Sequence, residues 1–267
     1  MEPTDALRAI ENGLRLVIRD QLGVDGWSKA LGAPDLERLE ARRVEETKRR
    51  DGVAVSDDLL NFTETYHLTA LVEKNWERFK PVFDDRARTL TYFGIIKDLR
   101  NSIAHSRELV PFERDLMSGI AGHLRSQISL FRSGQNESTR YYPLIETVCD
   151  SFGNEGAART QGGQRRVRLE VGQQLQFSGS AFSARGKTVK WFLARDLNHW
   201  MIGNDEVAAG DDVTFTYTIS EEDVSEALLV TIYVVAESRF HRNQSIPFGG
   251  YDDSRLFMYA VNPPDED

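Results

Sequence analysis

Apolar residues recur every three or four positions from residue 1 to about 133, and this spacing predicts amphipathic α-helices. A first helix begins near Thr4 or Asp5, either of which is placed to cap it, and its apolar face holds Leu7, Ile10, Leu14, Val17 and Ile18. A second helix is expected from Pro34 to Arg50, acidic in its early turns and basic in its last, as the helix dipole favours. The charged residues of this second helix are interpreted as a solvent-exposed face.

Three further helices are expected, joined by short connections. The third covers about 57–79 and stops at Pro81, with an apolar stripe of Leu68, Leu71, Val72, Trp76 and Phe79. The fourth covers about 86–105, with an inward stripe of Tyr92, Ile96, Leu99 and Ile103. The fifth begins at Pro111, and its inward residues are expected to be Phe112, Leu116, Ile120, Leu124 and Phe131. Five helices with short connections predict an α-helical bundle.

The pattern changes at 134–164, where polar and glycine-rich stretches flank a short ordered-looking piece, and we expect a linker there. Beyond residue 165 the apolar period becomes two, most clearly in Val213, Phe215, Tyr217 and Ile219. A continuous apolar run at 228–236 predicts a central strand and 256–261 the last one. Six or seven short strands over about 100 residues predict an antiparallel sandwich of immunoglobulin-like type.

The predicted fold class is therefore α + β in two domains: a helical bundle at 1–133, the linker, and an immunoglobulin-like β-sandwich at 165–263. The cysteine pair of antibody domains is absent, so Trp191 is expected to pack in the sandwich without a disulfide. Aromatic and histidine residues elsewhere in this half are interpreted as core and cross-strand pairs, namely Trp200, His199 and His241.

Composition limits the classes of function. The net charge of −9 argues against a protein that binds nucleic acid through a broad basic surface, so any RNA contact has to be local. Cys149 is the only cysteine, which excludes an intramolecular disulfide and a cysteine-rich zinc site. Neither a signal peptide nor a long apolar run is found, and we expect a soluble cytoplasmic protein without membrane contact.

The fourth helix carries the residues with chemical potential. At about 100° per residue, Arg100 falls about 70° and His105 about 150° from the middle of the apolar stripe, so His105 is expected to point away from its own bundle. Asn101 and His105 are four positions apart and share a face. Arg100 and His105 are about 140° apart, so their convergence on one small ligand needs a second copy of the chain.

The hexapeptide Arg100-Asn-Ser-Ile-Ala-His105 has the form R-N-x-x-A-H, late in one helix and before a turn and an apolar helix. In this context it resembles the R-x4-H motif of HEPN domains, and in particular a subgroup found at the end of a yeast nuclear mRNA-quality-control endoribonuclease. The resemblance covers about residues 5–150 and excludes the β domain. It implies a homodimer, formed through the HEPN domain, that cuts RNA without metal and leaves a 2′,3′-cyclic phosphate and a 5′-hydroxyl.

By this resemblance His105 is the general acid and base, Arg100 stabilises the phosphate and the transition state, and Asn101 supports them. The residue types suit the reaction, because an imidazole can move the proton of the RNA 2′-OH near neutral pH and a guanidinium can hold phosphoryl oxygens. No cofactor and no metal are expected, since the sequence holds no recognisable metal-binding motif. Family members controlled by a nucleotidyltransferase carry a tyrosine two positions after the histidine; here Arg107 stands there, so that regulation is not expected.

Two function classes remain open. The first is an endoribonuclease whose β-sandwich senses or recruits, such as a toxin or antiphage effector. The second is a non-catalytic HEPN dimer that presents the β-sandwich to a protein or a small ligand. A third, narrower interpretation makes the sandwich a nucleotide sensor, because the strand around Val189-Lys-Trp191 resembles the C-terminal sandwiches of some antiphage nucleotidyltransferases.

Overall fold

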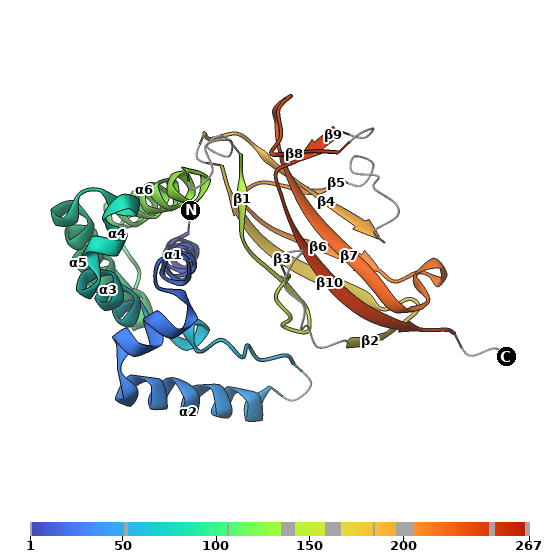
Figure 1. Ribbon diagram of the computed structural model, residues 1–267, viewed down its shortest axis with the longest axis horizontal. Coiled ribbons are helices and arrows are strands. Elements are labelled where there is room, and N and C mark those ends of the chain that lie inside the picture. Colours follow the sequence, from blue (N-terminus) through green and yellow to red (C-terminus); the bar gives the residue numbers. More distant parts are fainter. Residues whose placement is uncertain are drawn as a thin grey trace. The chain divides into compact units, whose positions relative to one another are not determined.

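The computed structural model describes residues 2–50, 53–105, 107–134, 142–157, 167–183, 185–195, 206–245 and 249–264. The chain forms two compact units: Met1–Lys48 with Asp57–Gln135, and Arg49–Ser56 with Asn136–Asp267. The first unit consists of helices and the second of strands, so the fold is α + β (Figure 1).

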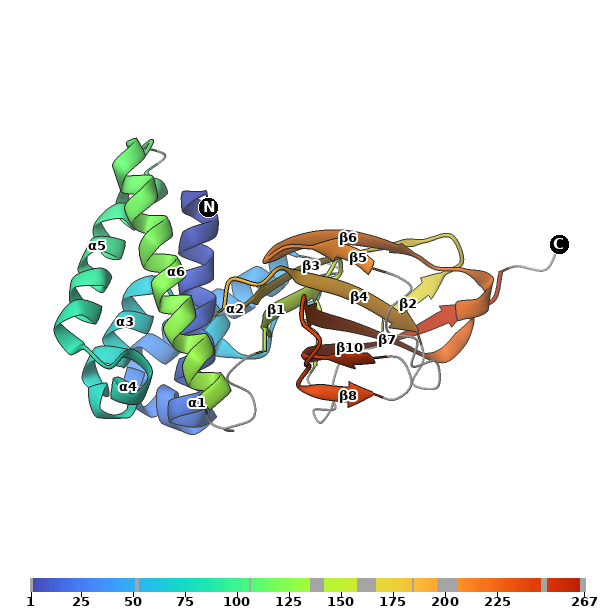
Figure 2. The same cartoon turned by 90° about the horizontal axis from the view of Figure 1, so that it is seen from above.

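The helical unit contains, in chain order, α1 (Pro3–Leu31), α2 (Ala33–Arg49), the 3-10 helix η1 (Leu59–Phe62), α3 (Thr65–Lys74), α4 (Trp76–Phe83), α5 (Arg86–Ala104) and α6 (Pro111–Gly134). Helices α1 and α6 run side by side (Figure 2). Gly23 interrupts α1 with a positive φ of 67°, which kinks the helix. The core of this unit includes the expected residues of the first and third helices, among them Ile10, Leu14, Leu68, Leu71 and Phe79.

Three expectations for the helices are corrected. The single helix expected at 57–79 is three elements, because Asp58 caps η1 and Glu64 begins a new helix. Pro81 does not end α4, which continues to Phe83. Phe112 and Leu116 do not point inward and are 69% and 41% exposed. The buried stripe of α6 instead contains Met117, Ile120, Ala121, Leu124 and Ile128.

The phase of α6 explains this last difference. The centre of the buried stripe lies between Met117 and Leu124, and at about 100° per residue Leu116 is about 100° from that centre and Phe112 about 140°. A spacing of four drifts by about 40° at each step, so residues chosen every fourth position leave the buried face within two turns. Val110, which precedes the helix, is also exposed.

The second unit contains β1 (Leu144–Asp150), β2 (Val167–Glu170), β3 (Gln174–Phe182), β4 (Val189–Arg195), β5 (Glu206–Ala209), β6 (Asp212–Thr218), β7 (Ser225–Ala236), β8 (Asn243–Ser245), β9 (Gly249–Tyr251) and β10 (Asp253–Asn262), with the 3-10 helix η3 (Glu221–Asp223). One sheet has the order β1-β3-β6 and a second the order β2-β10-β7-β4-β5, while β8 and β9 form a two-stranded ribbon. The two larger sheets share one apolar core.

Trp191 on β4 lies at the centre of this core and is fully buried, as expected for a sandwich without a disulfide. Its indole Nε1 donates to the carbonyl of Gly210 at 2.8 Å, which satisfies its polar group. A Cβ atom at Gly179 on β3 would lie 2.8 Å from the indole ring. A glycine is therefore needed opposite the tryptophan.

The boundaries of the second unit differ from those expected. The segment 134–164 is not only a linker, because Leu144–Asp150 is strand β1, paired with β3. Val53 to Ser56 also belong to this unit: the Ala54 N–H donates to the Phe152 carbonyl at 2.5 Å. Gly153 beside it has φ +82°, and a Cβ there would meet the Ala54 carbonyl oxygen. The larger sheet is not wholly antiparallel, since β2 runs parallel to β10.

Three buried aspartates hold the turns of this unit. Asp150 accepts from the Phe152 and Asn154 backbone N–H groups and from the Tyr259 hydroxyl. Asp223 accepts from the backbone and side chain of Ser220. Asp252, fully buried, accepts from the N–H groups of Ala236 (2.6 Å) and Arg242 (3.1 Å). Each carboxylate thus satisfies backbone donors that its turn would otherwise leave unpaired.

Candidate functional site

Helix α5 carries the three residues of the R-N-x-x-A-H motif, and its two ends have clear causes. The Asp85 side chain caps the first turn by accepting from the Arg88 N–H at 3.0 Å. The helix ends at Ala104, and His105 is the C-cap residue, with φ −94° and ψ 17° and its N–H directed at the Asn101 carbonyl. Ser106 lies outside the described residues.

His105 and Asn101 are both exposed, one turn apart, at the C-terminal end of α5. Neither side chain has a polar partner among the described residues. This agrees with the phase argument that His105 points away from its own bundle. Both side chains are therefore accessible to a ligand from solvent.

Arg100 is half-buried and lies beside the N-terminus of α3. Its Nη2 is 3.3 Å from the Oε2 atom of Glu64, and the two side chains are 34% and 32% exposed. The other carboxylate oxygen, Oε1 of Glu64, is 2.7 Å from Nη2 of Arg42 on α2. One carboxylate therefore joins two guanidiniums from different helices, a group that we call the Arg42–Glu64–Arg100 cluster.

His67 closes the first turn of α3 around the Glu64 backbone. The His67 N–H donates to the Glu64 carbonyl at 2.9 Å, and Nδ1 of His67 accepts from the Glu64 N–H at 3.1 Å. His67 is 2% exposed, and burial lowers its pKa. The imidazole is thus a neutral structural group with its proton on Nε2, an atom that is buried and has no partner in the described part of the chain.

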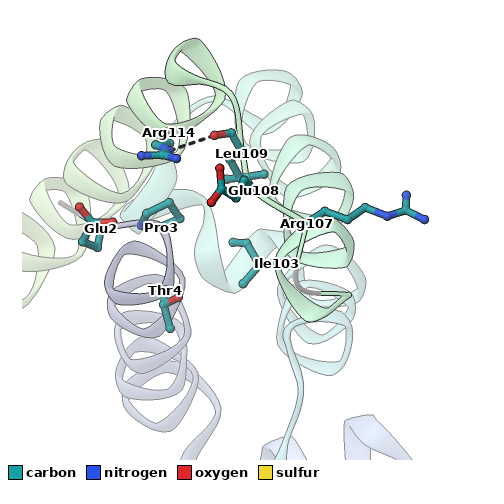
Figure 3. A pocket seen from close by; sticks show the side chains of 8 residues that line it. All are labelled: Glu2, Pro3, Thr4, Ile103, Arg107, Glu108, Leu109 and Arg114. Carbon is teal, nitrogen blue, oxygen red and sulfur yellow. Dashed lines mark hydrogen bonds between the residues drawn. The ribbon is translucent and has the colours of Figure 1, made fainter.

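A small pocket of about 180 Å³ lies near the motif, at the start of α1 and between α5 and α6 (Figure 3). Ile103 and Glu108 line it, and Arg114 closes one side by donating to the Leu109 carbonyl at 2.9 Å. The Arg107 side chain extends away from it. Since Ile103 is about 160° from His105 around α5, the pocket and the exposed imidazole face different sides.

Within one chain, Arg100 and His105 do not converge. They are about 140° apart around α5 and separated by about 7.5 Å along its axis. The structure instead brings Arg100 together with Arg42 and Glu64, which the sequence interpretation did not single out. The residue pattern held no signal for this, because α2 reads as a charged helix face and Glu64 lies 36 positions before Arg100.

The described residues contain no group of three or more His, Cys, Asp or Glu side chains placed to hold a metal ion. Among the described helices, none combines the length and apolar character that a membrane crossing requires.

Histidine and cysteine side chains of the second unit have structural surroundings. His241 Nδ1 lies 3.4 Å from the buried Asp252 carboxylate. Burial raises the pKa of the Cys149 thiol to about 12, so this thiol is protonated and a poor nucleophile at neutral pH. His199 and Trp200 lie outside the described residues.

Comparisons with known proteins give little further information. No protein-family model matches the sequence, and no curated protein matches it. Among solved structures, a C. elegans twitchin kinase fragment, described as an autoregulated protein kinase with immunoglobulin domains, aligns over 64% of this chain at 11% identity and a TM-score of 0.23. The aligned part spans 33% of that chain. A similarity this slight carries no conclusion about fold or function.

Proposed function

We propose that the protein is a metal-independent endoribonuclease of HEPN type that acts as a homodimer. The observation that carries this proposal is the exposure of His105 and Asn101 on one face at the end of α5, with Arg100 on the same helix directly before Asn101. An exposed imidazole beside an amide, together with a guanidinium from a second copy of the chain, provides the groups that RNA transesterification uses.

The reaction needs only proton transfer and charge stabilisation. An imidazole takes the proton of the RNA 2′-OH, the 2′-oxygen attacks the adjacent phosphorus, and the 5′-oxygen leaves with a proton from an imidazolium. The products are a 2′,3′-cyclic phosphate and a 5′-hydroxyl end. His105 from two chains would supply the base and the acid, and Arg100 would bind the phosphoryl oxygens as their negative charge increases.

The geometry supports a second copy in two ways. Arg100 and His105 of one chain lie on different sides of α5, so a compact site needs residues from two chains. Val110, Phe112 and Leu116, directly after the motif, expose apolar side chains, with Phe112 69% exposed. Exposed apolar groups of this size favour burial against a partner.

We further infer that the second unit is an immunoglobulin-like sandwich that senses or recruits. Immunoglobulin domains pack strands A, B and E on a sheet of G, F and C, and the orders β1-β3-β6 and β10-β7-β4 correspond to these. Trp191 on β4 then takes the place of the strand C tryptophan. A sensing or recruiting sandwich fits a nuclease that acts as a toxin or antiphage effector.

The second candidate function is a non-catalytic HEPN dimer that presents the sandwich to a protein or a small ligand, such as a nucleotide. The ion pair of Arg100 with Glu64 favours this second candidate, because an arginine with only a structural role would also bind Glu64. This candidate predicts no RNA turnover and tight binding of a partner that depends on the second unit.

An RNase assay in EDTA separates the two. We expect the wild type to cleave RNA and His105→Ala to lose roughly 10²- to 10⁴-fold in rate, with Arg100→Ala also impaired. Arg86→Ala, an exposed arginine at the start of the same helix, is the matched control and should cleave normally. Cyclic phosphate ends identify the reaction. Equal cleavage by His105→Ala and the wild type would show that the activity does not come from this site.

A further inference from the structure

The Arg42–Glu64–Arg100 cluster holds two arginines on one carboxylate. Glu64 binds one guanidinium with each of its oxygens, Arg42 through Oε1 and Arg100 through Oε2. The Glu64 backbone is anchored at the start of α3 by His67, whose N–H donates to the Glu64 carbonyl and whose Nδ1 accepts from the Glu64 N–H. The carboxylate therefore places the two guanidiniums side by side.

Both guanidiniums keep free donors. A guanidinium has five N–H groups, and one contact to Glu64 uses few of them. No other polar partner of Arg42 or Arg100 occurs among the described residues, and their side chains are 46% and 34% exposed. The unused N–H groups can therefore reach an anion in solvent.

The charge of the cluster also favours an anion. Two cations and one carboxylate leave a net positive charge at one spot of a protein whose net charge is −9. Two other arginines of α2 contact carboxylates that have no second arginine partner among the described residues: Arg38 contacts Asp35, and Arg43 contacts Glu40 on α2 and Asp57 beyond it. Arg42 thus differs from its neighbours because its carboxylate is shared with a second cation.

We propose that Arg42 and Arg100 bind one phosphate of an RNA strand together, and that Glu64 is the positioning residue that holds them for it. This inference rests on the proposed function, and it adds α2 to a site otherwise confined to α5. Two guanidiniums around one phosphate offer more donors than one can, and each guanidinium is a planar group whose paired N–H donors match phosphate oxygens. The site meets the requirement that RNA contacts of this acidic protein be local.

Binding of a 2′-O-methyl oligoribonucleotide in EDTA tests the proposal, because this probe has no nucleophilic 2′-OH and cannot be cleaved. We expect Arg42→Gln to weaken binding about 5- to 30-fold, and Arg100→Gln to do the same. The double variant, which leaves this phosphate without either guanidinium, should also reduce the slope of log affinity against log salt by about 0.7. Arg43→Gln, the adjacent arginine on α2, is the matched control and should bind like the wild type.

Glu64→Gln tests the positioning role, since it keeps the size of the side chain but removes the charge that holds both arginines. In the Glu64→Gln background, Arg42→Gln should weaken probe binding less than it does in the wild type. On a logarithmic scale of affinity, we expect the decrease to be about half as large or smaller. An unchanged effect would mean that Glu64 does not position Arg42.

The outcomes separate this inference from the proposed function. If the wild type binds the probe and cleaves RNA but Arg42→Gln matches Arg43→Gln in affinity, the shared phosphate site is wrong and the nuclease proposal stands. If the wild type neither binds the probe nor cleaves RNA, both proposals fail. Binding that depends on Arg42 and Arg100 without cleavage would retain the phosphate site and remove the nuclease.

Discussion

Carboxylates have different surroundings in the two units. Asp252 in the sheet unit is fully buried, and its oxygens accept from two backbone N–H groups beside His241. Glu64 in the helical unit is 32% exposed, and its two arginine partners keep donors without a partner among the described residues. The first arrangement serves the fold alone. The second leaves bonding capacity for a ligand, and this difference indicates where function is to be sought.

The largest effect on stability is expected from Asp252→Ala. Loss of the carboxylate leaves the buried Ala236 N–H and the partly buried Arg242 N–H without an acceptor, and we expect the sheet unit to lose about 2–4 kcal/mol of unfolding free energy. Urea unfolding followed by hydrogen exchange of peptides from each unit measures this. Glu226→Ala, which removes an exposed ion pair with Arg168, is the control and should cost less than about 1 kcal/mol. Equal costs would contradict the contrast between buried and exposed carboxylates.

Gly179→Ala should come next. The new methyl group would meet the Trp191 ring at 2.8 Å, and a fully buried indole has little room to move, so we expect a cost of about 1–3 kcal/mol. Gly172→Ala is not a neutral control, because Gly172 has a positive φ. Gly119→Ala on α6 has open space around it and a helical backbone, and should be neutral or slightly stabilising.

A smaller, pH-dependent effect is expected at His67. Burial lowers the pKa of His67, so its imidazole binds a proton less well in the folded chain than in the unfolded chain. The stability that neutral His67 contributes is therefore complete above pH 6.5 and is lost as the pH falls from there through the pKa of the folded state. Protonation also removes the Nδ1 acceptor of the Glu64 N–H. Thermal unfolding of the wild type should therefore shift to lower temperature in acid more than that of His67→Asn. Identical shifts would show that His67 does not contribute.

The smallest effect on stability is expected at the cluster itself. Arg42→Gln and Arg100→Gln each remove a partly exposed ion pair, which solvent screens, so each should cost less than about 1 kcal/mol. A loss as large as that of Asp252→Ala in urea unfolding would make the cluster structural. Weaker RNA binding by these variants could then result from unfolding and would not demonstrate a lost phosphate contact.

Sequence patterns predicted the helices and most strands because buried apolar residues recur with the period of a helix or a strand. They gave β1 only as a short ordered piece of the linker and not as a strand, because Leu144 and Ile145 are both buried and a register shift between Ile145 and Thr147 breaks the alternation. They predicted that His105 faces away from the core, and His105 is exposed at the C-cap of α5, because its direction follows from the phase of the helix that it ends. The contact of Arg42 and Arg100 with Glu64 was not predictable, because it depends on how α2, α3 and α5 meet.

The pairing of Ala54 with Phe152 has a consequence for the order in which the chain is made. At about 5–20 residues per second, the ribosome releases Phe152 roughly 5–20 s after Ala54. During this interval the helices can form, but the stretch between α2 and η1 has no acceptor for its Ala54 N–H. The second unit therefore cannot be obtained by cutting the chain once after α6. A fragment that starts at residue 136 would lack residues 49–56, which belong to the same unit.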